Sequence, residues 1–321
     1  MARKLTVAVN WQGKLDFTGL IERAKIADAA GIHSIWVAEA WGRDAFTLLT
    51  ILAEHTKKIQ LATSIVNIYS RTPAALAQHF GTLDELSDGR VIIGLGTSGP
   101  QVIEHFHGVK FNPPLTRMKE CVEIINLLIA GTPLKYQGRL FKLSRGFTLR
   151  FEPVRKHIPV WIASLNPKSV EFTARQADGW LPVMIPLSGL KRAIDDFRAV
   201  ARAAGRAPTA VEVKAPGHVT VTNNPERALA GHAGTVAFYA ARMGTLLRRA
   251  THPLRVWRRR RESQGSLEQG RCQRRNRGAL GKTFERAWLH RRYRGSGRAP
   301  EGPGPGGRRF ASGGNRRLKP R

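Results

Sequence analysis

Three stretches of the chain place small, hydroxyl-bearing or charged residues directly after short apolar runs. Glycines let a backbone approach a planar ring or a phosphate closely, and the N–H groups at a helix start favour an anion. A carboxylate at the end of a strand can position a substrate or relay a proton. The residues with these properties are Glu39, Ser64, Gly96, Thr97, Ser98, Asn166 and Lys168. They are the candidate ligand-binding residues of the chain.

Each candidate also has an ordinary structural interpretation. The glycines of GLG (94–96) suit a tight turn between a strand and a helix, and NPKS (166–169) suits a plain helix cap. Glu39 could simply pair with Arg43, and Arg71 could reach an anionic cofactor tail. His105 and His107 are spaced i, i+2, which is poor helical geometry for a metal, so we assign no metal site.

The first 245 residues alternate short apolar runs with amphipathic stretches, which predicts a parallel βα sheet or barrel. Thr72 can cap the helix that begins at Pro73. Residues 133–153 interrupt the alternation and predict a polar β-hairpin. The predicted strands are 5–11, 33–40, 58–67, 90–98, 158–164, 180–185 and 211–221, and the clearest helices are 16–31, 45–56, 72–89, 115–131 and 224–244.

Three passages are distinctive when taken together: IWVAEAWGRDAF (35–46), the run from Leu61 to Pro100 with SRTP, LDELSDGR and GLGTSGP, and PVWIASLNPKSVEFTARQADGWLP (159–182). From about residue 4 to residue 245 the chain resembles the luciferase-like monooxygenase superfamily. It is most similar to the coenzyme F420-dependent branch that includes methylene-tetrahydromethanopterin reductase. The resemblance implies an α/β fold, a (β/α)8 TIM barrel whose active site lies at the carboxyl ends of the strands.

The resemblance also implies where the cofactor lies. A non-proline cis peptide at Ser64–Ile65 would back the deazaflavin ring, Gly96, Thr97 and Ser98 would lie against the cofactor, and Asn166 and Lys168 would meet its phosphate. Glu39 matches an acidic residue near the deazaflavin. Some deazaflavin dehydrogenases carry a His beside this acid and a Glu after the glycine turn, where this chain has Ala40 and Gly99. This departure argues against a sugar-phosphate or alcohol dehydrogenase mechanism.

The implied function is an oxidoreductase that transfers a hydride between coenzyme F420 and a small organic molecule. The alternative is an FMN-dependent monooxygenase supplied by a separate reductase. We expect a homo-oligomer if the barrel is complete. The two cysteines are too few for a disulfide framework and favour a reducing cytosol, and the N-terminus has neither a signal peptide nor a membrane span. The expected localisation is therefore cytoplasmic.

Residues 246–321 differ sharply in composition from the domain at 1–245. They carry +19 of the net charge of +30, with 21 Arg, 12 Gly, a single Val and no Ile. Such a composition buries too little apolar surface to offset ordering entropy, so the expected state is disorder. A basic tail of this kind would bind nucleic acid only non-specifically.

The predicted barrel has seven strands before residue 246 and needs an eighth beyond it. Translation out of frame is one explanation for the tail, because GC-rich DNA read in a neighbouring frame encodes many Arg, Gly, Pro and Ala residues. A functional basic tail is the other. If the closing strand and helix are missing, we expect poor solubility and little activity from the chain as written.

Overall fold

The computed structural model describes residues 4–9, 13–183, 185–207, 209–215, 217 and 221–242, and all of them belong to one compact unit. The predicted domain boundary at 245/246, the eighth strand, the basic tail with its nucleic-acid binding and the change of reading frame lie outside these residues. No described helix is long and apolar enough to cross a membrane.

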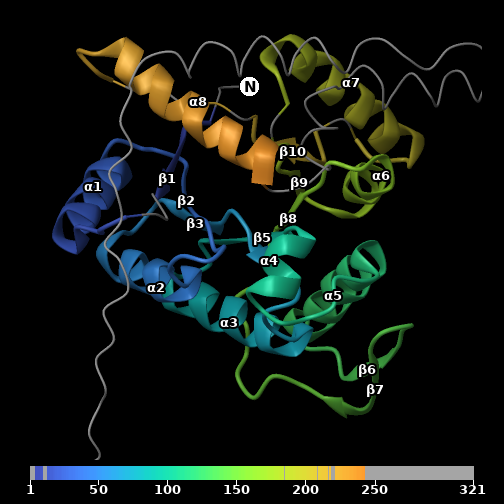
Figure 1. Cartoon of the computed structure of the whole chain (residues 1–321). Coiled ribbons are helices and arrows are strands. Elements are labelled where there is room, and N and C mark those ends of the chain that lie inside the picture. The colour runs from blue at the N-terminus through green and yellow to red at the C-terminus, as the bar shows by residue number, and fades with distance from the viewer. Residues whose placement is uncertain are drawn as a thin grey trace, which may run out of the picture. The chain divides into compact units, whose positions relative to one another are not determined.

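A parallel sheet forms the centre of the molecule (Figure 1). The main path of the sheet is β1-β2-β3-β5-β8-β9-β10, in the order of the chain, and the short β4 pairs with β5 beside this path. This order is the order of a barrel, because in an open doubly wound sheet it would reverse at one point. All seven predicted strands are present. The strands are β1 (Thr6–Val9), β2 (Ser34–Val37), β3 (Gln60–Thr63), β4 (Val66–Asn67), β5 (Val91–Gly96), β8 (Val160–Ala163), β9 (Gly179–Trp180) and β10 (Glu212–Val213).

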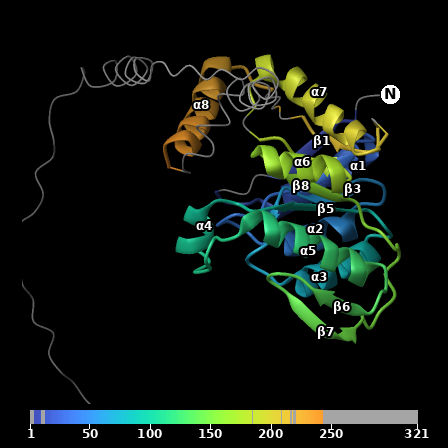
Figure 2. The same cartoon turned by 90° about the vertical axis from the view of Figure 1, so that its right-hand side faces the viewer.

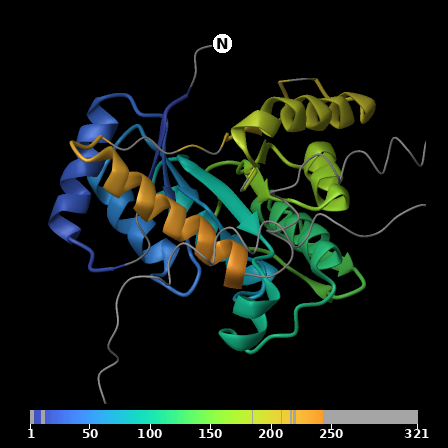
Figure 3. The same ribbon diagram turned by 45° about the horizontal axis from the view of Figure 1, so that its top comes forward.

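Three of the helices that connect the strands begin at capping side chains. Asp16, Asp44 and Thr72 each accept a hydrogen bond from the backbone N–H three residues later, which confirms Thr72 as a cap. The helices are α1 (Phe17–Ala29), α2 (Ala45–His55), α3 (Pro73–Leu86), α4 (Pro100–His105), α5 (Pro114–Ile129), α6 (Pro167–Gln176), α7 (Leu187–Ala203) and α8 (Pro225–Arg242). Figure 3 shows α8, in orange, crossing in front of the sheet.

The alternation of side chains along the strands divides the core into two layers. Ile35 and Val37 of β2 belong to the large cluster between the sheet and the helices. Trp36, between them, belongs to a second cluster with Trp161, and these two rings lie 5.3 Å apart. The smaller cluster occupies the inner side of the curved sheet.

The two ends of the sheet approach each other. Lys4, just before β1, forms a 2.7 Å ion pair with Glu212 of β10 across 208 residues of sequence. The sheet is therefore curled in the manner of the predicted barrel. Among the described residues no strand pairs with the outer edge of β1 or of β10.

The predicted hairpin is also present. Strands β6 (Leu134–Gln137) and β7 (Lys142–Phe147) form a separate antiparallel pair, which lies away from the parallel sheet beyond α5 (Figure 2). The buried carboxylate of Glu120 in α5 accepts backbone hydrogen bonds from residues 139–141 and ties the hairpin to that helix. The hairpin is thus a structural excursion that leaves the carboxyl ends of the parallel strands open.

Candidate functional site

A cavity of about 270 Å³ opens at the carboxyl ends of β2, β3, β5 and β8. Small residues from these strand ends form its floor, and larger apolar side chains from the helices form its walls. Glu39 is the only lining residue with an ionisable side chain among the described residues. The lining comprises Ala38, Glu39, Ala40, Trp41, Ser64, Ile65, Gly96, Thr97, Ser98, Gly99, Val102, Leu115, Met118, Ile162, Ala163, Ser164, Leu165, Asn166, Ser169, Phe172 and Val183.

The predicted cis peptide between Ser64 and Ile65 is confirmed. It divides the predicted strand 58–67 into β3 and β4, and both halves pair with β5. The amide of Glu39 donates to the Ile65 carbonyl at 3.2 Å, which ties the end of β2 to this bulge. The bulge therefore turns Ser64 and Ile65 toward the cavity, where both are lining residues.

Gly94 and Gly96 permit the close packing behind the bulge. A Cβ atom on Gly94 would lie 1.7 Å from the Thr63 carbonyl oxygen. A Cβ on Gly96 would lie 2.7 Å from the Ile65 side chain. The structural reason for glycine here is therefore contact between strands, while Gly96, Thr97 and Ser98 also line the cavity as the sequence predicts. Ser98 has a φ of 55°, in the left-handed region, just before α4.

Asn166 and Lys168 lie at the start of α6, and only Asn166 lines the cavity. Asn166 is the N-cap by position, but its side chain makes no capping hydrogen bond. Pro167 has no N–H group, and no described residue accepts a hydrogen bond from the amides of Lys168 and Ser169. Lys168 is exposed beside this helix start. The structure therefore brings Asn166 to the site and places Lys168 outside the lining.

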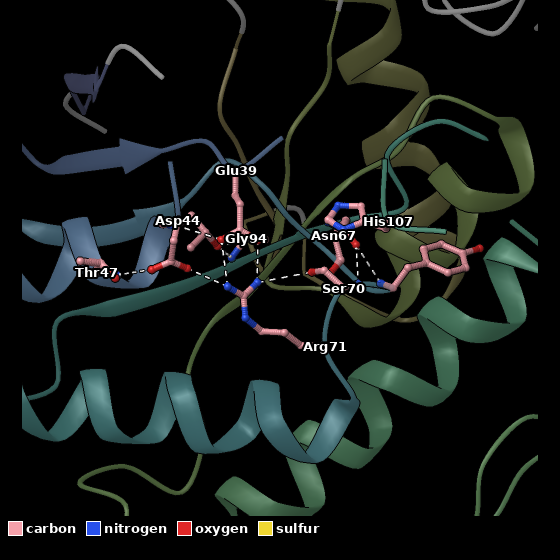
Figure 4. Close-up of polar contacts among 11 residues, drawn as sticks. Glu39, Asp44, Thr47, Asn67, Ser70, Arg71, Gly94 and His107 are labelled. Atoms are coloured by element: carbon pink, nitrogen blue, oxygen red, sulfur yellow. Dashed lines mark hydrogen bonds and ion pairs between the residues drawn. The ribbon is translucent and has the colours of Figure 1, made fainter. Parts of the chain in front are cut away.

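Glu39 is held by Arg71 rather than by Arg43. Arg71 Nη1 lies 2.6 Å from Glu39 Oε1, and Arg71 Nη2 lies 3.2 Å from Oε2. Arg43 instead donates to the Gly13 carbonyl at 2.6 Å. Figure 4 shows the Arg71 guanidinium between the carboxylates of Glu39 and Asp44. Arg71 is thus paired with two carboxylates of this chain, and its contact with an anionic cofactor tail stays a prediction.

Asp44 completes this cluster at the start of α2. Its Oδ2 accepts the Thr47 amide and its Oδ1 accepts from Arg71 at 2.7 Å. Burial alone would raise the pKa of the Asp44 carboxyl, but the hydrogen bonds from Thr47 and the charge of Arg71 hold it below its usual value. Burial lowers the pKa of His79, and the positive charge of Arg71 lowers this pKa further. The cluster therefore favours ionised Asp44 beside a neutral imidazole.

Sequence reasoning missed Arg71 and Asp44 as partners of Glu39. Arg71 precedes the cap of α3 and lies 32 residues from Glu39 along the chain. The only local signal was an arginine next to a cap, which is common on surfaces. The apolar wall formed by Leu115, Met118 and Phe172 was also missed, because helix residues of this type are ordinarily core residues.

Comparison with known proteins shows the family to which the chain belongs. The family model described as luciferase-like monooxygenase matches residues 6–316. A Mycobacterium tuberculosis protein named as a coenzyme F420-dependent oxidoreductase is 33% identical over 254 residues, covering 75% of this chain and 73% of that protein. The 5,10-methylenetetrahydromethanopterin reductase of Archaeoglobus fulgidus is 32% identical over 218 residues, covering 68% of this chain and 64% of its own length.

Among solved structures, the coenzyme F420-dependent tetrahydromethanopterin reductase of Methanopyrus kandleri superposes with a TM-score of 0.67 at 24% identity. The match covers 76% of this chain and 74% of that one. At this identity the superposition supports the fold alone, and it agrees with the barrel-type strand order.

Proposed function

Because the chain belongs to the luciferase-like monooxygenase family, we propose that it is an oxidoreductase that uses coenzyme F420 to transfer a hydride to or from a small organic molecule. The observation that carries this proposal is the cavity at the carboxyl ends of the strands, which Ser64, Ile65 and Gly96 line beside Glu39. The Mycobacterium tuberculosis relative that is named for coenzyme F420 aligns with 75% of this chain. This similarity supports the choice of cofactor.

The cavity residues fit a planar ring. Ser64, Ile65 and Gly96 give a low floor against which a ring can lie, and the helix side chains give apolar walls. Hydroxyls of Ser64, Thr97 and Ser98 lie within the lining and can bond to ring heteroatoms. A bound deazaflavin supplies the hydride at its C5, while the protein binds it, orients the substrate and excludes water.

The phosphate of the cofactor would lie at the start of α6. Two amides without partners among the described residues point to an anion there, and the helix dipole adds to their effect. Asn166 sits between this helix start and the cavity, and Lys168 adds a nearby positive charge in solvent. In this arrangement the cavity residues would hold the ring, and Asn166 with the start of α6 would hold the phosphate.

Glu39 would contact the substrate or the reacting ring, because it is the ionisable residue of the lining. The absence of a His at Ala40 and of a Glu at Gly99 leaves no second ionisable side chain among the described lining residues. We therefore expect a reaction in which the protein does not pass a proton between two side chains. In such a reaction the substrate carbon accepts a hydride, and no His–Glu pair of the protein protonates the substrate.

Equilibrium binding tests the cofactor assignment. Purified full-length protein is titrated with F420 and, separately, with FMN, and the change in fluorescence of each is recorded. We expect saturable binding of F420 and at least tenfold weaker binding of FMN. Tight FMN binding without F420 binding would overturn the proposal and favour the flavin monooxygenase alternative.

A second titration tests the phosphate position. Lys168→Met should weaken the binding of F420 about two- to fivefold, in line with the loss of one exposed charge near the anion. It should leave the binding of a deazaflavin ring that lacks the phosphate tail unchanged. Lys156→Met, which removes a lysine paired with Glu152 away from α6, is the matched control for net charge.

A further inference from the structure

We propose that Arg71 is a positioning residue that fixes the Glu39 carboxylate as a hydrogen-bond acceptor for the ring bound in the cavity. This inference rests on the proposed function for the identity of the ring. Arg71 does not line the cavity, whereas Glu39 does. Glu39 is the lining residue to which Arg71 bonds, so the effect of Arg71 on a bound ring would pass through Glu39.

Three donors engage the Glu39 carboxylate. Arg71 binds it with two nitrogens, and the Ala45 amide at the first turn of α2 donates to Oε2 at 3.0 Å. An ionised carboxylate has about four lone-pair sites. These three bonds fix the orientation of the carboxylate, and Glu39 keeps acceptor capacity for a donor in the cavity that it lines.

Arg71 is itself fixed from several sides. Its guanidinium also bonds to Asp44 at 2.7 Å and lies 4.9 Å from the Phe46 ring centroid. The side chains of Glu39 and Arg71 are 9% and 20% exposed, so water screens their pairing only weakly. The two-pronged contact of a planar guanidinium with a carboxylate defines orientation as well as charge.

The charged and titratable groups around Glu39 come from three parts of the structure. Arg71 and Ser70 precede α3, Asp44 begins α2, and His79 of α3 stacks on Phe46 at 4.6 Å. The guanidinium of Arg71 donates hydrogen bonds to Glu39 and accepts none. The arrangement therefore suits a fixed acceptor better than a proton relay.

A double-mutant cycle on ring binding separates positioning from a general structural role. Arg71→Met, Glu39→Ala and the double variant are titrated with F420 by fluorescence. We expect about tenfold weaker binding in each single variant, and no further loss in the double variant, because Arg71 acts only through Glu39. Arg71→Lys keeps the charge but not the two-pronged contact, so it should recover binding only in part and leave a loss of about three- to fivefold.

Arg43→Met is the matched control, since it removes a neighbouring arginine that bonds to the Gly13 carbonyl and not to Glu39. It should change binding less than twofold, and in combination with Glu39→Ala its effect should multiply. The unfolding midpoint of each variant is measured without ligand. If any of these variants does not fold, the cycle is repeated with Arg71→Lys, Glu39→Gln and the variant that combines them.

The outcomes separate the inference from the function on which it rests. If the losses of F420 affinity in the two single variants multiply, the double variant should bind about a hundredfold more weakly. That result would overturn the positioning role of Arg71 and leave the F420 assignment intact. Binding of FMN alone would overturn the cofactor assignment, and the same cycle with FMN would still decide the role of Arg71. Binding of neither ring would overturn both.

Discussion

The middle of the parallel sheet and its two ends differ in how completely they are buried. Every residue of β2 and β5 is buried, and these strands carry the cavity at their carboxyl ends. In β1 at one end the residues are half-buried or exposed, and β10 at the other end contains only two residues. The site is therefore built on the part of the sheet that already has neighbours on both edges.

This difference in burial means that closure of the barrel and construction of the cavity involve different strands. Closure of the barrel concerns β1 and β10, where Leu5 and Val7 are 68% and 38% exposed. Construction of the cavity concerns β2 to β8 and the close contacts around Gly94 and Gly96. We expect changes in the middle of the sheet to cost far more free energy of unfolding than matched changes at its ends.

The largest effect should come from Gly94→Ala. The added Cβ would meet the Thr63 carbonyl at 1.7 Å, a backbone atom that cannot move without parting β3 from β5. We expect a loss of at least about 3 kcal/mol in the free energy of unfolding. Urea unfolding followed by circular dichroism measures it. Gly231→Ala in α8, where nothing lies within 4 Å of the new atom, is the control and should not destabilise.

A matched pair of truncations compares the middle and the end directly. Ile35 of β2 is 2% exposed and pairs in register with Val7 of β1. Ile35→Ala should cost about 2–4 kcal/mol, because it leaves a cavity in the core. Val7→Ala should cost less than about 1 kcal/mol. Equal losses in the two variants would show that the end of the sheet is covered in solution, and the comparison would fail.

Strand existence and order could be predicted from sequence, since seven apolar runs separated by amphipathic stretches leave few alternatives. The strand lengths could not. The run 180–185 gives only Gly179–Trp180 as β9, because strand pairing and not hydrophobicity decides where a strand ends. The cis peptide came from the family resemblance, since a run of β-branched residues alone indicates an unbroken strand.

The site residues were predictable where they follow a strand and unpredictable where they depend on tertiary partners. Ser64, Gly96 and Asn166 reach the cavity because the carboxyl ends of parallel strands meet at one face. Arg71 bonds to Glu39 across three elements, and no local pattern encodes that contact. Lys168 lies two residues after Asn166, in the first turn of α6, and it is exposed.

A pH-dependent effect is expected at the amino ends of the parallel strands, away from the cavity, at Asp28. Its carboxylate accepts hydrogen bonds from the amides of residues 57–59 and links α1 to the start of β3. Burial opposes ionisation, yet these N–H donors and the charge of Arg90 bring the pKa of Asp28 below its ordinary value. A lowered folded-state pKa stabilises the fold above the unfolded pKa of about 3.9, and the gain is lost as pH falls through the folded value.

Asp28→Asn should therefore cost about 1–2 kcal/mol at neutral pH, and the difference from the original chain should shrink as the pH approaches about 3. Chemical unfolding at a series of pH values measures it. A constant difference across that range would mean that packing, and not the charge of Asp28, accounts for the loss. Glu22→Gln on the exposed side of α1 is the control for removing one carboxylate.

The smallest effect should come from the ion pair that joins the ends of the sheet. Lys4 and Glu212 side chains are 50% and 46% exposed, so water and salt screen their attraction. A double-mutant cycle with Lys4→Met and Glu212→Gln should give a coupling of less than about 1 kcal/mol that falls further at high salt. A larger, salt-insensitive coupling would mean that the two ends are held together from within a dry interface. In that case the ends of the sheet would be as buried as its middle strands, and closure of the barrel would contribute to stability as much as construction of the cavity does.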